Sequence, residues 1–330
     1  MRLAILGAGA WGTALGVALA PHHQIALWAR DPTQCRALAA ERVNARYLPD
    51  VAIPKHVRIT PDLNSVVDNS ELIVVAVPTL ALRQTLSLVA SVSPAAGVVW
   101  LCKGFEPGSA KFPHQVADEE LHAVQPRAAL SGPSFASEVA RGLPAAVTLA
   151  SHDAQFATIA SRALHTGLLR VYSSDDLVGV ETGGAVKNVI AIAAGVCDGL
   201  ELGASARAAV ITRGLAELTR LGLRLGGRAE TFMGLAGAGD LMLTATSDLS
   251  RNRRVGLQLA KGESLSAALA KLGHVAEGVH SAKEVLRLAV RLSVDMPITA
   301  AVSRLLDGTS TARGLVGELL QRERKHESVP

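Results

Sequence analysis

The sequence predicts an α/β protein in which a mostly parallel sheet domain is followed by an all-α domain. At the start of the chain, apolar runs at residues 2–6 and 23–28 flank a glycine turn and a helix-length stretch at 13–20, which is the order of a βαβ unit. Short β-rich runs then alternate with helix-length segments up to about residue 175, which indicates an open parallel sheet. Beyond that point strand-like runs become scarce. We therefore place the domains at 1–178 and 179–330.

The remaining elements follow from local composition. The segment 32–42 is helix-like, and nearly continuous apolar runs, typical of parallel strands buried on both faces, predict strands at 72–77, 98–101, 128–130 and 145–150. Helix-length segments in the second domain predict helices at 178–197, 207–221, 254–261, 265–271, 279–289 and 299–306. The polar tail at 321–330 is expected to fray.

Composition excludes several classes of protein. Of the 330 residues, 49% are hydrophobic and 19% charged, which is enough apolar material for a large core. A net charge of +4 and only 3% aromatic residues argue against a nucleic-acid partner. The three cysteines are scattered, with no metal-ligand spacing, so we expect free thiols and no metal. No apolar run reaches about 18 residues without charges or breakers, so we expect no membrane insertion.

The most specific motif is Gly7-x-Gly9-x-x-Gly12, which matches the dinucleotide fingerprint. The first glycine permits the tight turn, the second lets the backbone approach a pyrophosphate, and the third allows close packing of helix on strand. The helix that follows directs its free N–H groups at the phosphates. Because the motif follows a strand and opens a helix, it predicts a Rossmann-type domain that binds NAD or NADP. A merely structural glycine turn is the alternative.

The residues after the second predicted strand bear on the choice of cofactor. Arg30 has the chemistry to pair with a 2′-phosphate and to stack on adenine, which favours NADP(H). Asp31 is the alternative ligand, for the ribose hydroxyls of NAD(H). A second glycine cluster at 237–240 follows no strand and lacks the third glycine, so we do not expect a second dinucleotide site there.

Two lysines stand out by their positions. Lys187 and Asn188 interrupt an otherwise apolar helix, and Gly184 and Gly195 lie near the same face, which suggests a close approach of another group. A lysine that extends to the surface from a packed helix is the alternative. Lys103 follows the strand at 98–101 and is expected at the carboxyl edge of the sheet, where ligands of open α/β folds bind. A solvated loop lysine is the alternative.

Polar residues in the second half of the chain suggest a phosphate site. The segment 250–254 combines arginines with Asn252 at the start of a helix, and forked guanidinium donors with a neutral amide suit phosphate. A charged helix end on the surface is the alternative. Asp240 and Thr244 precede this segment. The segment Ser131–Ala136 falls one glycine short of a nucleophile elbow and has no arguable Asp and His partners, so a serine hydrolase is rejected.

Taken together, these segments resemble bacterial-type NAD(P)-dependent glycerol-3-phosphate dehydrogenase, and they occur in the family's order over nearly the whole chain. The matching segments are Gly7–Leu15, Lys103-Gly104, Leu130–Ala136, Val186-Lys187-Asn188, Gly237–Leu241 and Ser250-Arg251-Asn252. The resemblance implies a helical domain of the 6-phosphogluconate-dehydrogenase C-terminal type. It also implies a cytoplasmic homodimer that interconverts dihydroxyacetone phosphate and sn-glycerol 3-phosphate and so feeds phospholipid synthesis.

The resemblance further implies a role for individual residues. Lys187 is the expected catalytic acid–base, and its pKa must fall from about 10.4 to about 7–8 for that task. The expected substrate contacts are Lys103, Gly132, Ser134, Lys187, Asn188, Asp240, Thr244, Ser250, Arg251 and Asn252. The expected cofactor contacts are Gly7, Gly9, Ala10, Trp11, Gly12, Arg30, Lys103, Ala136, Arg251, Val275 and Glu277. The alternatives are a 3-hydroxyacid or 6-phosphogluconate-type dehydrogenase of the same architecture and a non-catalytic dinucleotide sensor.

Overall fold

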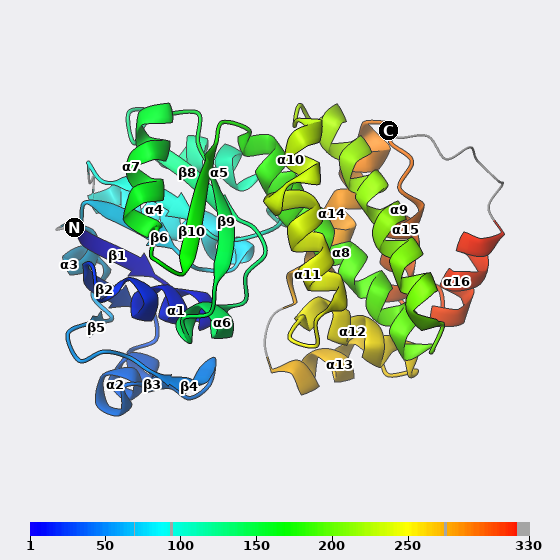
Figure 1. The fold of residues 1–330 in the computed structure, drawn as a ribbon, viewed down its shortest axis with the longest axis horizontal. Helices are drawn as coiled ribbons and strands as arrows, with labels where there is room; N and C mark the ends of the chain where they lie inside the picture. Colours follow the sequence, from blue (N-terminus) through cyan, green and yellow to red (C-terminus); the bar gives the residue numbers. More distant parts are fainter. Residues whose placement is uncertain (69, 93–94, 274–275, 322–330) are drawn as a thin grey trace. The chain divides into compact units, whose positions relative to one another are not determined.

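The computed structural model describes residues 1–68, 70–92, 95–273 and 276–321 (Figure 1). The chain divides into two compact units. The sheet unit comprises Met1–Cys102 and Pro113–Leu177, and the helical unit comprises Lys103–Phe112 and Val178–Pro330. The short segment Lys103–Phe112, called the Lys103 segment below, thus belongs to the helical unit, although the chain before and after it belongs to the sheet unit. The predicted division into two contiguous domains does not include such a segment. The expected fraying of the tail concerns residues that, except for Gln321, lie outside the described part of the chain.

The sheet unit contains an eight-stranded sheet within the described residues. All neighbouring strands are parallel except β8 and β9, so the prediction of a mostly parallel sheet is confirmed. In spatial order the strands are β5 (Arg58–Thr60), β2 (Gln24–Trp28), β1 (Arg2–Leu6), β6 (Leu72–Val75), β7 (Gly97–Trp100), β8 (Arg127–Ser131), β9 (Ala145–Ala150) and β10 (Leu169–Ser174). The arrangement from β5 to β8 is the strand order of a Rossmann fold.

Helices connect these strands, as expected for parallel pairs. They are α1 (Ala10–Leu19), α2 (Pro32–Glu41), α3 (Leu63–Val67), the 3₁₀ turn η1 (Thr79–Ala81), α4 (Leu82–Val92), α5 (Pro113–Glu120), α6 (Ala136–Ala140) and α7 (Ala154–Leu164). The hairpin of β3 (Val43–Asn44) and β4 (Leu48–Ala52) was not predicted, and neither were β5 and β10. These strands are short or carry several polar residues, so they lack the continuous apolar run that marks the central strands.

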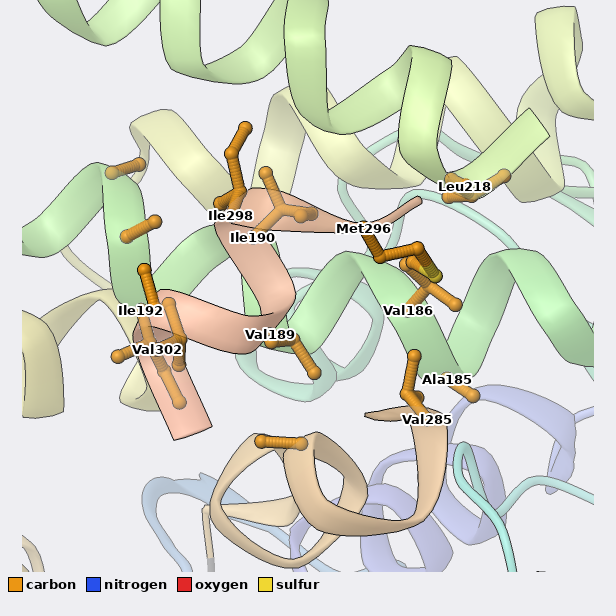
Figure 2. Close-up of a cluster of buried hydrophobic side chains, with 14 of the residues drawn as sticks. Ala185, Val186, Val189, Ile190, Ile192, Leu218, Val285, Met296, Ile298 and Val302 are labelled. Atoms are coloured by element: carbon orange, nitrogen blue, oxygen red, sulfur yellow. The ribbon is translucent and has the colours of Figure 1, made fainter. Parts of the chain in front are cut away.

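The helical unit is built around α8 (Leu177–Gly199). Its other elements are α9 (Gly203–Arg224), α10 (Ala229–Met233), the π-helical turn η2 (Leu235–Gly239), α11 (Asp240–Thr246), α12 (Arg251–Ala260), α13 (Leu265–Leu272), α14 (Glu277–Arg291), α15 (Pro297–Leu306) and α16 (Ala312–Leu320). Figure 2 shows part of the core, to which α8 contributes Val186 and Val189, α14 contributes Val285 and α15 contributes Val302. All four side chains are buried.

Helix α8 is apolar on all sides because it runs through this core. By length and composition alone, α8 is also the one helix among the described residues that is long and apolar enough to cross a membrane, and 94% of that stretch is buried inside the protein. The core helix of a globular unit meets the same criterion. The mostly apolar sequence of α8 makes the adjacent polar residues Lys187 and Asn188 conspicuous.

Candidate active site

The glycine loop after β1 has the geometry that its sequence predicts. Gly7 has φ +117°, and a Cβ there would lie 2.7 Å from the carbonyl oxygen of Ala76. A Cβ at Gly12 would lie 1.9 Å from the carbonyl oxygen of Gly7. At Gly9, in contrast, a Cβ would meet no atom within 4 Å. Gly7 and Gly12 are therefore required by the protein's own packing, whereas Gly9 leaves open space for an approaching group.

The start of α1 fits the pyrophosphate of a dinucleotide. Gly9 is the N-cap residue of this helix, and no side chain caps it. No acidic residue occupies the first turn. The N-terminal N–H groups and the positive end of the helix dipole therefore suit a bound anion. Ala10 and Trp11 are the first two residues of α1, and both are half-buried.

Side chains of α2 and of the β3–β4 hairpin support the glycine loop. The carbonyl oxygen of Ala8 accepts hydrogen bonds from Gln34 Nε2 at 2.8 Å and from Asn44 Nδ2 at 3.1 Å. Asn44 Nδ2 also donates to Thr13 Oγ1 at 2.7 Å, and Asn44 is buried. These contacts cannot be predicted from a local motif because they join residues that are 26 to 36 positions apart in the sequence. The Gly7 N–H in the same loop donates to the Trp28 carbonyl oxygen at 3.1 Å, so the loop is bound to β2 as well.

Three other expected cofactor and substrate contacts also lie in the sheet unit. Ala136 begins α6 and packs against Ala14 of α1 and Leu48 of the hairpin. Gly132, just after β8, has φ +139°, and Ser134 Oγ donates a hydrogen bond to its carbonyl oxygen at 3.0 Å. Ser134 is half-buried. The structure thus brings Ala136 to the helix of the glycine loop and places Gly132 and Ser134 at the end of β8.

Arg30 and Asp31 follow β2, and both are exposed. Asp31 is the N-cap residue of α2, and its Oδ1 accepts a hydrogen bond from the Thr33 N–H at 2.8 Å. No hydrogen bond or ion pair with another described residue holds the Arg30 side chain. The Asp31 carboxylate, the candidate ligand of the ribose hydroxyls, therefore already caps α2. The Arg30 guanidinium, the candidate ligand of a 2′-phosphate, has no such structural role among the described residues.

The helical unit brings together three charged side chains that are far apart in the sequence. Lys187 of α8 and Asp240 of α11 are 6% and 1% exposed, and Lys187 Nζ forms an ion pair with Asp240 Oδ1. Lys103 Nζ lies 2.7 Å from the other carboxylate oxygen, Oδ2, and its side chain is 15% exposed. Lys187 therefore does not extend to the surface, and Lys103 is not a freely solvated loop lysine. One buried carboxylate binds two amines.

These contacts shift the pKa values of the buried groups. The pKa of Lys187 is lowered from 10.5 to about 7, mainly because burial removes water from the ammonium group. Repulsion by Lys103 lowers this pKa further, and the attraction of Asp240 raises it only in part. Burial by itself raises the pKa of Asp240, but the two lysines outweigh it and hold that pKa below 3.8. Near neutral pH the cluster therefore contains an ionised Asp240 and a Lys187 poised between ammonium and free amine.

Close helix packing explains how Asp240 reaches α8. Asp240 directly follows the π-helical turn η2, a geometry that often marks functional sites. A Cβ at Gly183 of α8 would lie 2.2 Å from the carbonyl oxygen of Ala236 in this turn, so only glycine allows the approach. One helical turn later, Thr244 Oγ1 accepts a hydrogen bond from Lys187 Nζ at 3.0 Å and donates to the Asp240 carbonyl oxygen at 2.6 Å.

A chain of amides lies beside the charged cluster. Asn252 Nδ2 donates to Asn188 Oδ1 at 2.9 Å, and Asn252 Oδ1 accepts from the Gly278 N–H at 3.0 Å. Asn188 Nδ2 donates to the Gly184 carbonyl oxygen at 3.1 Å and to the Lys103 carbonyl oxygen at 3.5 Å. The chain joins α8, α12, α14 and the Lys103 segment. No local sequence pattern predicts the part that Gly278 plays in this chain.

The basic segment at the start of α12 divides into residues with different surroundings. Ser250 is the N-cap, and its Oγ accepts from the Arg253 N–H at 3.2 Å. Arg253 is buried in ion pairs with Asp198 and Asp248, at 2.7 and 2.6 Å. Arg251 is exposed. Arg253 is therefore structural, whereas the guanidinium groups of Arg251 and Arg254 are exposed.

The two remaining expected cofactor contacts are Glu277 and Val275. Glu277 is the first residue of that helix and immediately precedes Gly278. Val275 lies outside the described residues. Within the described part of the chain, no three His, Cys, Asp or Glu side chains gather as a metal site.

A Rossmann-type sheet unit with a dinucleotide glycine loop, followed by a helical unit with a lysine that titrates near neutrality, defines a class of nicotinamide-dependent oxidoreductases. Family models narrow the class: the N-terminus and the C-terminus of NAD-dependent glycerol-3-phosphate dehydrogenase match residues 2–157 and 176–316. The chain belongs to this family.

Individual relatives agree with this assignment. The chain is 56% identical to a glycerol-3-phosphate dehydrogenase (NAD(P)+) of Nitrosospira multiformis and 55% identical to one of Dechloromonas aromatica, with 99% of each chain covered in both comparisons. Among solved structures, it is similar to glycerol-3-phosphate dehydrogenase from Coxiella burnetii, with 41% identity and a TM-score of 0.93 over 97% of this chain and 98% of that one.

Proposed function

We propose that this protein reversibly reduces dihydroxyacetone phosphate to sn-glycerol 3-phosphate with NAD(P)H and so supplies glycerophospholipid synthesis. The observation that carries the proposal is the buried Lys187, whose pKa of about 7 suits acid–base work at neutral pH. The names of the relatives support the substrate, since each is a glycerol-3-phosphate dehydrogenase.

Lys187 acts as the acid–base in the proposed reaction. The bound nicotinamide supplies the hydride to the ketone carbon. As the carbonyl π bond breaks, the oxygen takes its electron pair and needs a proton, which the Lys187 ammonium donates. In the oxidation direction the free amine of Lys187 removes the proton from the hydroxyl. Both forms are populated near neutrality because the pKa lies at about 7.

Asp240, Lys103 and Thr244 prepare Lys187 for this role. Asp240 and Thr244 fix the position of the amine through the ion pair and the 3.0 Å hydrogen bond. Lys103 balances the carboxylate and places a positive charge close to the developing negative charge on the substrate oxygen. Asn188 is a further substrate contact in this proposal, as are Gly132 and Ser134 of the sheet unit.

Arg251 and Asn252 bind the substrate phosphate, with Ser250 beside them. The exposed guanidinium of Arg251 offers forked donors. Asn252 uses one amide hydrogen for Asn188, and the amide group has a second hydrogen that suits a phosphate oxygen. Arg251 is proposed to contact the cofactor as well.

We propose NADP(H) as the preferred cofactor, with NAD(H) also accepted. The support is Arg30, whose guanidinium is exposed, whereas the Asp31 carboxylate caps α2. The other proposed cofactor contacts are Gly7, Gly9, Ala10, Trp11, Gly12, Lys103, Ala136 and Glu277. The family resemblance also supports a cytoplasmic homodimer, and sedimentation equilibrium of the purified protein tests the dimer.

The proposed function is tested by assaying purified protein with dihydroxyacetone phosphate against NADPH and NADH. We expect turnover with the phosphorylated ketone, a lower Michaelis constant for NADPH, and loss of that preference in Arg30→Ser. A preference for 6-phosphogluconate or a 3-hydroxyacid would instead favour the related dehydrogenases. Binding of NADPH without turnover on any of these substrates would favour a dinucleotide sensor.

A further inference from the structure

Two side chains of α14 bind both backbone groups of a single residue in the Lys103 segment. The Gly108 N–H donates to Glu284 Oε1 at 3.0 Å, and the Gly108 carbonyl oxygen accepts from an Arg287 terminal nitrogen at 2.6 Å. The same Arg287 nitrogen lies 3.1 Å from Glu284 Oε2. The Glu284 side chain is only 5% exposed. A buried carboxylate and its arginine partner thus bind the two consecutive peptide groups that flank the Gly108 Cα.

The segment that they hold is internally tied. The rings of Phe105 and Phe112 are buried, with centroids 4.8 Å apart, and both belong to the core of the helical unit. Between them, the Glu106 N–H donates to the Lys111 carbonyl oxygen at 2.9 Å, and the Ala110 N–H donates to the Glu106 carbonyl oxygen at 3.0 Å. Because of these internal contacts, a displacement of Gly108 is expected to displace the whole segment 103–112.

Lys103 stands at the start of this segment, where it joins the charged cluster. Its carbonyl oxygen accepts from Asn188, and its Nζ lies 2.7 Å from Asp240. We propose that Glu284 and Arg287 are positioning residues, which hold the segment 103–112 on α14 and thereby keep the Lys103 ammonium on Asp240. The consequence for catalysis rests on the proposed role of Lys187.

Displacement of Lys103 has a predictable effect on Lys187. The groups that face the Lys187 amine are Asp240 and the neutral hydroxyl of Thr244 from α11, and Lys103 from the segment. Lys103 lowers the pKa of Lys187 by repulsion, and it also shares the carboxylate of Asp240. When Lys103 moves away, both effects disappear. The pKa of Lys187 must then rise.

The test compares Arg287→Met with Lys283→Met in the full-length protein. Lys283 is an exposed lysine one helical turn earlier on α14, so the control removes the same charge from the same helix. Two quantities are measured without substrate: deuterium exchange of a peptide spanning 103–112, and the pH dependence of Lys187 labelling by an amine-reactive anhydride. In Arg287→Met we expect roughly tenfold faster exchange and labelling that titrates at higher pH, because a hydrogen bond to a charged group is lost.

Further variants connect the effect to Lys103. Glu284→Leu is expected to act in the same direction, and Glu284→Gln, which keeps an acceptor for the Gly108 N–H, is expected to retain part of the protection. In a Lys103→Met background, Arg287→Met must no longer shift the titration of Lys187.

Each outcome has a definite meaning. Exchange and titration in Arg287→Met that match Lys283→Met overturn the proposal, and so does an undiminished shift in the Lys103→Met background. Neither measurement needs turnover. If Lys187→Ala remains active, the acid–base assignment fails, whereas the positioning of Lys103 by Glu284 and Arg287 is still decided by these two readouts.

Discussion

Lys187 illustrates how one residue acquires its chemistry from its surroundings. A shift of its pKa from 10.5 to about 7 corresponds to about 5 kcal/mol in favour of the neutral amine. The structure shows that the protein's own helical core already buries the amine. Repulsion by Lys103 lowers the pKa further, and the attraction of Asp240 in the ion pair opposes both effects.

The direction of the reaction decides which form of Lys187 is needed. Reduction needs the ammonium, so we expect the rate of dihydroxyacetone phosphate reduction to fall as the pH rises through about 7. Oxidation of glycerol 3-phosphate needs the amine, so its rate rises over the same range. Lys187→Ala is expected to lower kcat by about 10²- to 10⁴-fold while NADPH affinity is kept. Initial rates in both directions and fluorescence titration with NADPH measure these effects.

Asp240→Asn provides the complementary change. It removes the attraction that raises the pKa of Lys187, so the pH profile must move to lower pH. Turnover near the wild-type level in Lys187→Ala contradicts the acid–base role. A profile that does not move in Asp240→Asn contradicts the electrostatic coupling.

At the scale of elements, the crossing of α8 and α12 determines where Asn252 lies. A Cβ at Gly195 of α8 would lie 1.9 Å from the carbonyl oxygen of Arg253, and a Cβ at Gly256 of α12 would lie 2.0 Å from that of Ile192. The two helices are therefore in backbone contact. This contact places the Asn252 amide within 2.9 Å of Asn188.

We predict that Gly195→Ala destabilises the protein by about 2–3 kcal/mol, because an added methyl group meets backbone that cannot rotate away. The matched control is Gly317→Ala in α16, where a Cβ meets no atom within 4 Å. Alanine has the higher helix propensity, so the control is expected to be neutral or up to about 1 kcal/mol more stable. Urea denaturation followed by circular dichroism measures both. Equal stabilities for the two variants would refute the close crossing.

For the whole molecule, two buried groups have pKa values that affect folding over different pH ranges. Glu217 of α9 is 1% exposed. Its carboxylate caps the start of α15, because it accepts hydrogen bonds from the N–H groups of Ile298 and Thr299 and from the Thr299 hydroxyl. Burial raises the pKa of Glu217 to about 7, although these donors and Arg220 oppose the shift. Its contribution to stability is complete below pH 4.5 and is lost as the pH rises through about 7.

Lys187 acts in the opposite sense. Its pKa is lowered on folding, so its contribution is present above pH 10.5 and is lost as the pH falls through about 7. Of these two groups, Glu217 and not Lys187 therefore changes the free energy of unfolding with pH between pH 5 and 7.

We predict that the free energy of unfolding of the wild type, relative to Glu217→Gln, falls by on the order of 3 kcal/mol between pH 5 and 8. Glutamine does not titrate, so the variant lacks this dependence. Glu41→Gln, which changes an exposed glutamate at the end of α2, serves as the control and is expected to follow the wild type. Urea denaturation at several pH values tests this. A constant difference between wild type and Glu217→Gln would show that Glu217 does not titrate in this range.

The sequence by itself determined the Rossmann-type sheet, the helical second half, the glycine loop and the family. These features depend on local patterns: apolar runs of strand length, a glycine spacing tied to one turn, and motifs that can be read in order along the chain. The short strands β3 to β5 and the polar strand β10 carry too weak a local pattern to be predicted.

Only the tertiary structure decided how the polar residues are shared among their partners. Lys103, Lys187 and Asp240 are separated by 53 to 137 residues, and which amine lies on which carboxylate oxygen depends on helix crossings that local sequence does not encode. The same holds for Arg253, which resembles Arg251 in the sequence but is buried in structural ion pairs. Burial and charge arise from contacts between distant segments, so the pKa values that make the site reactive are properties of the folded chain.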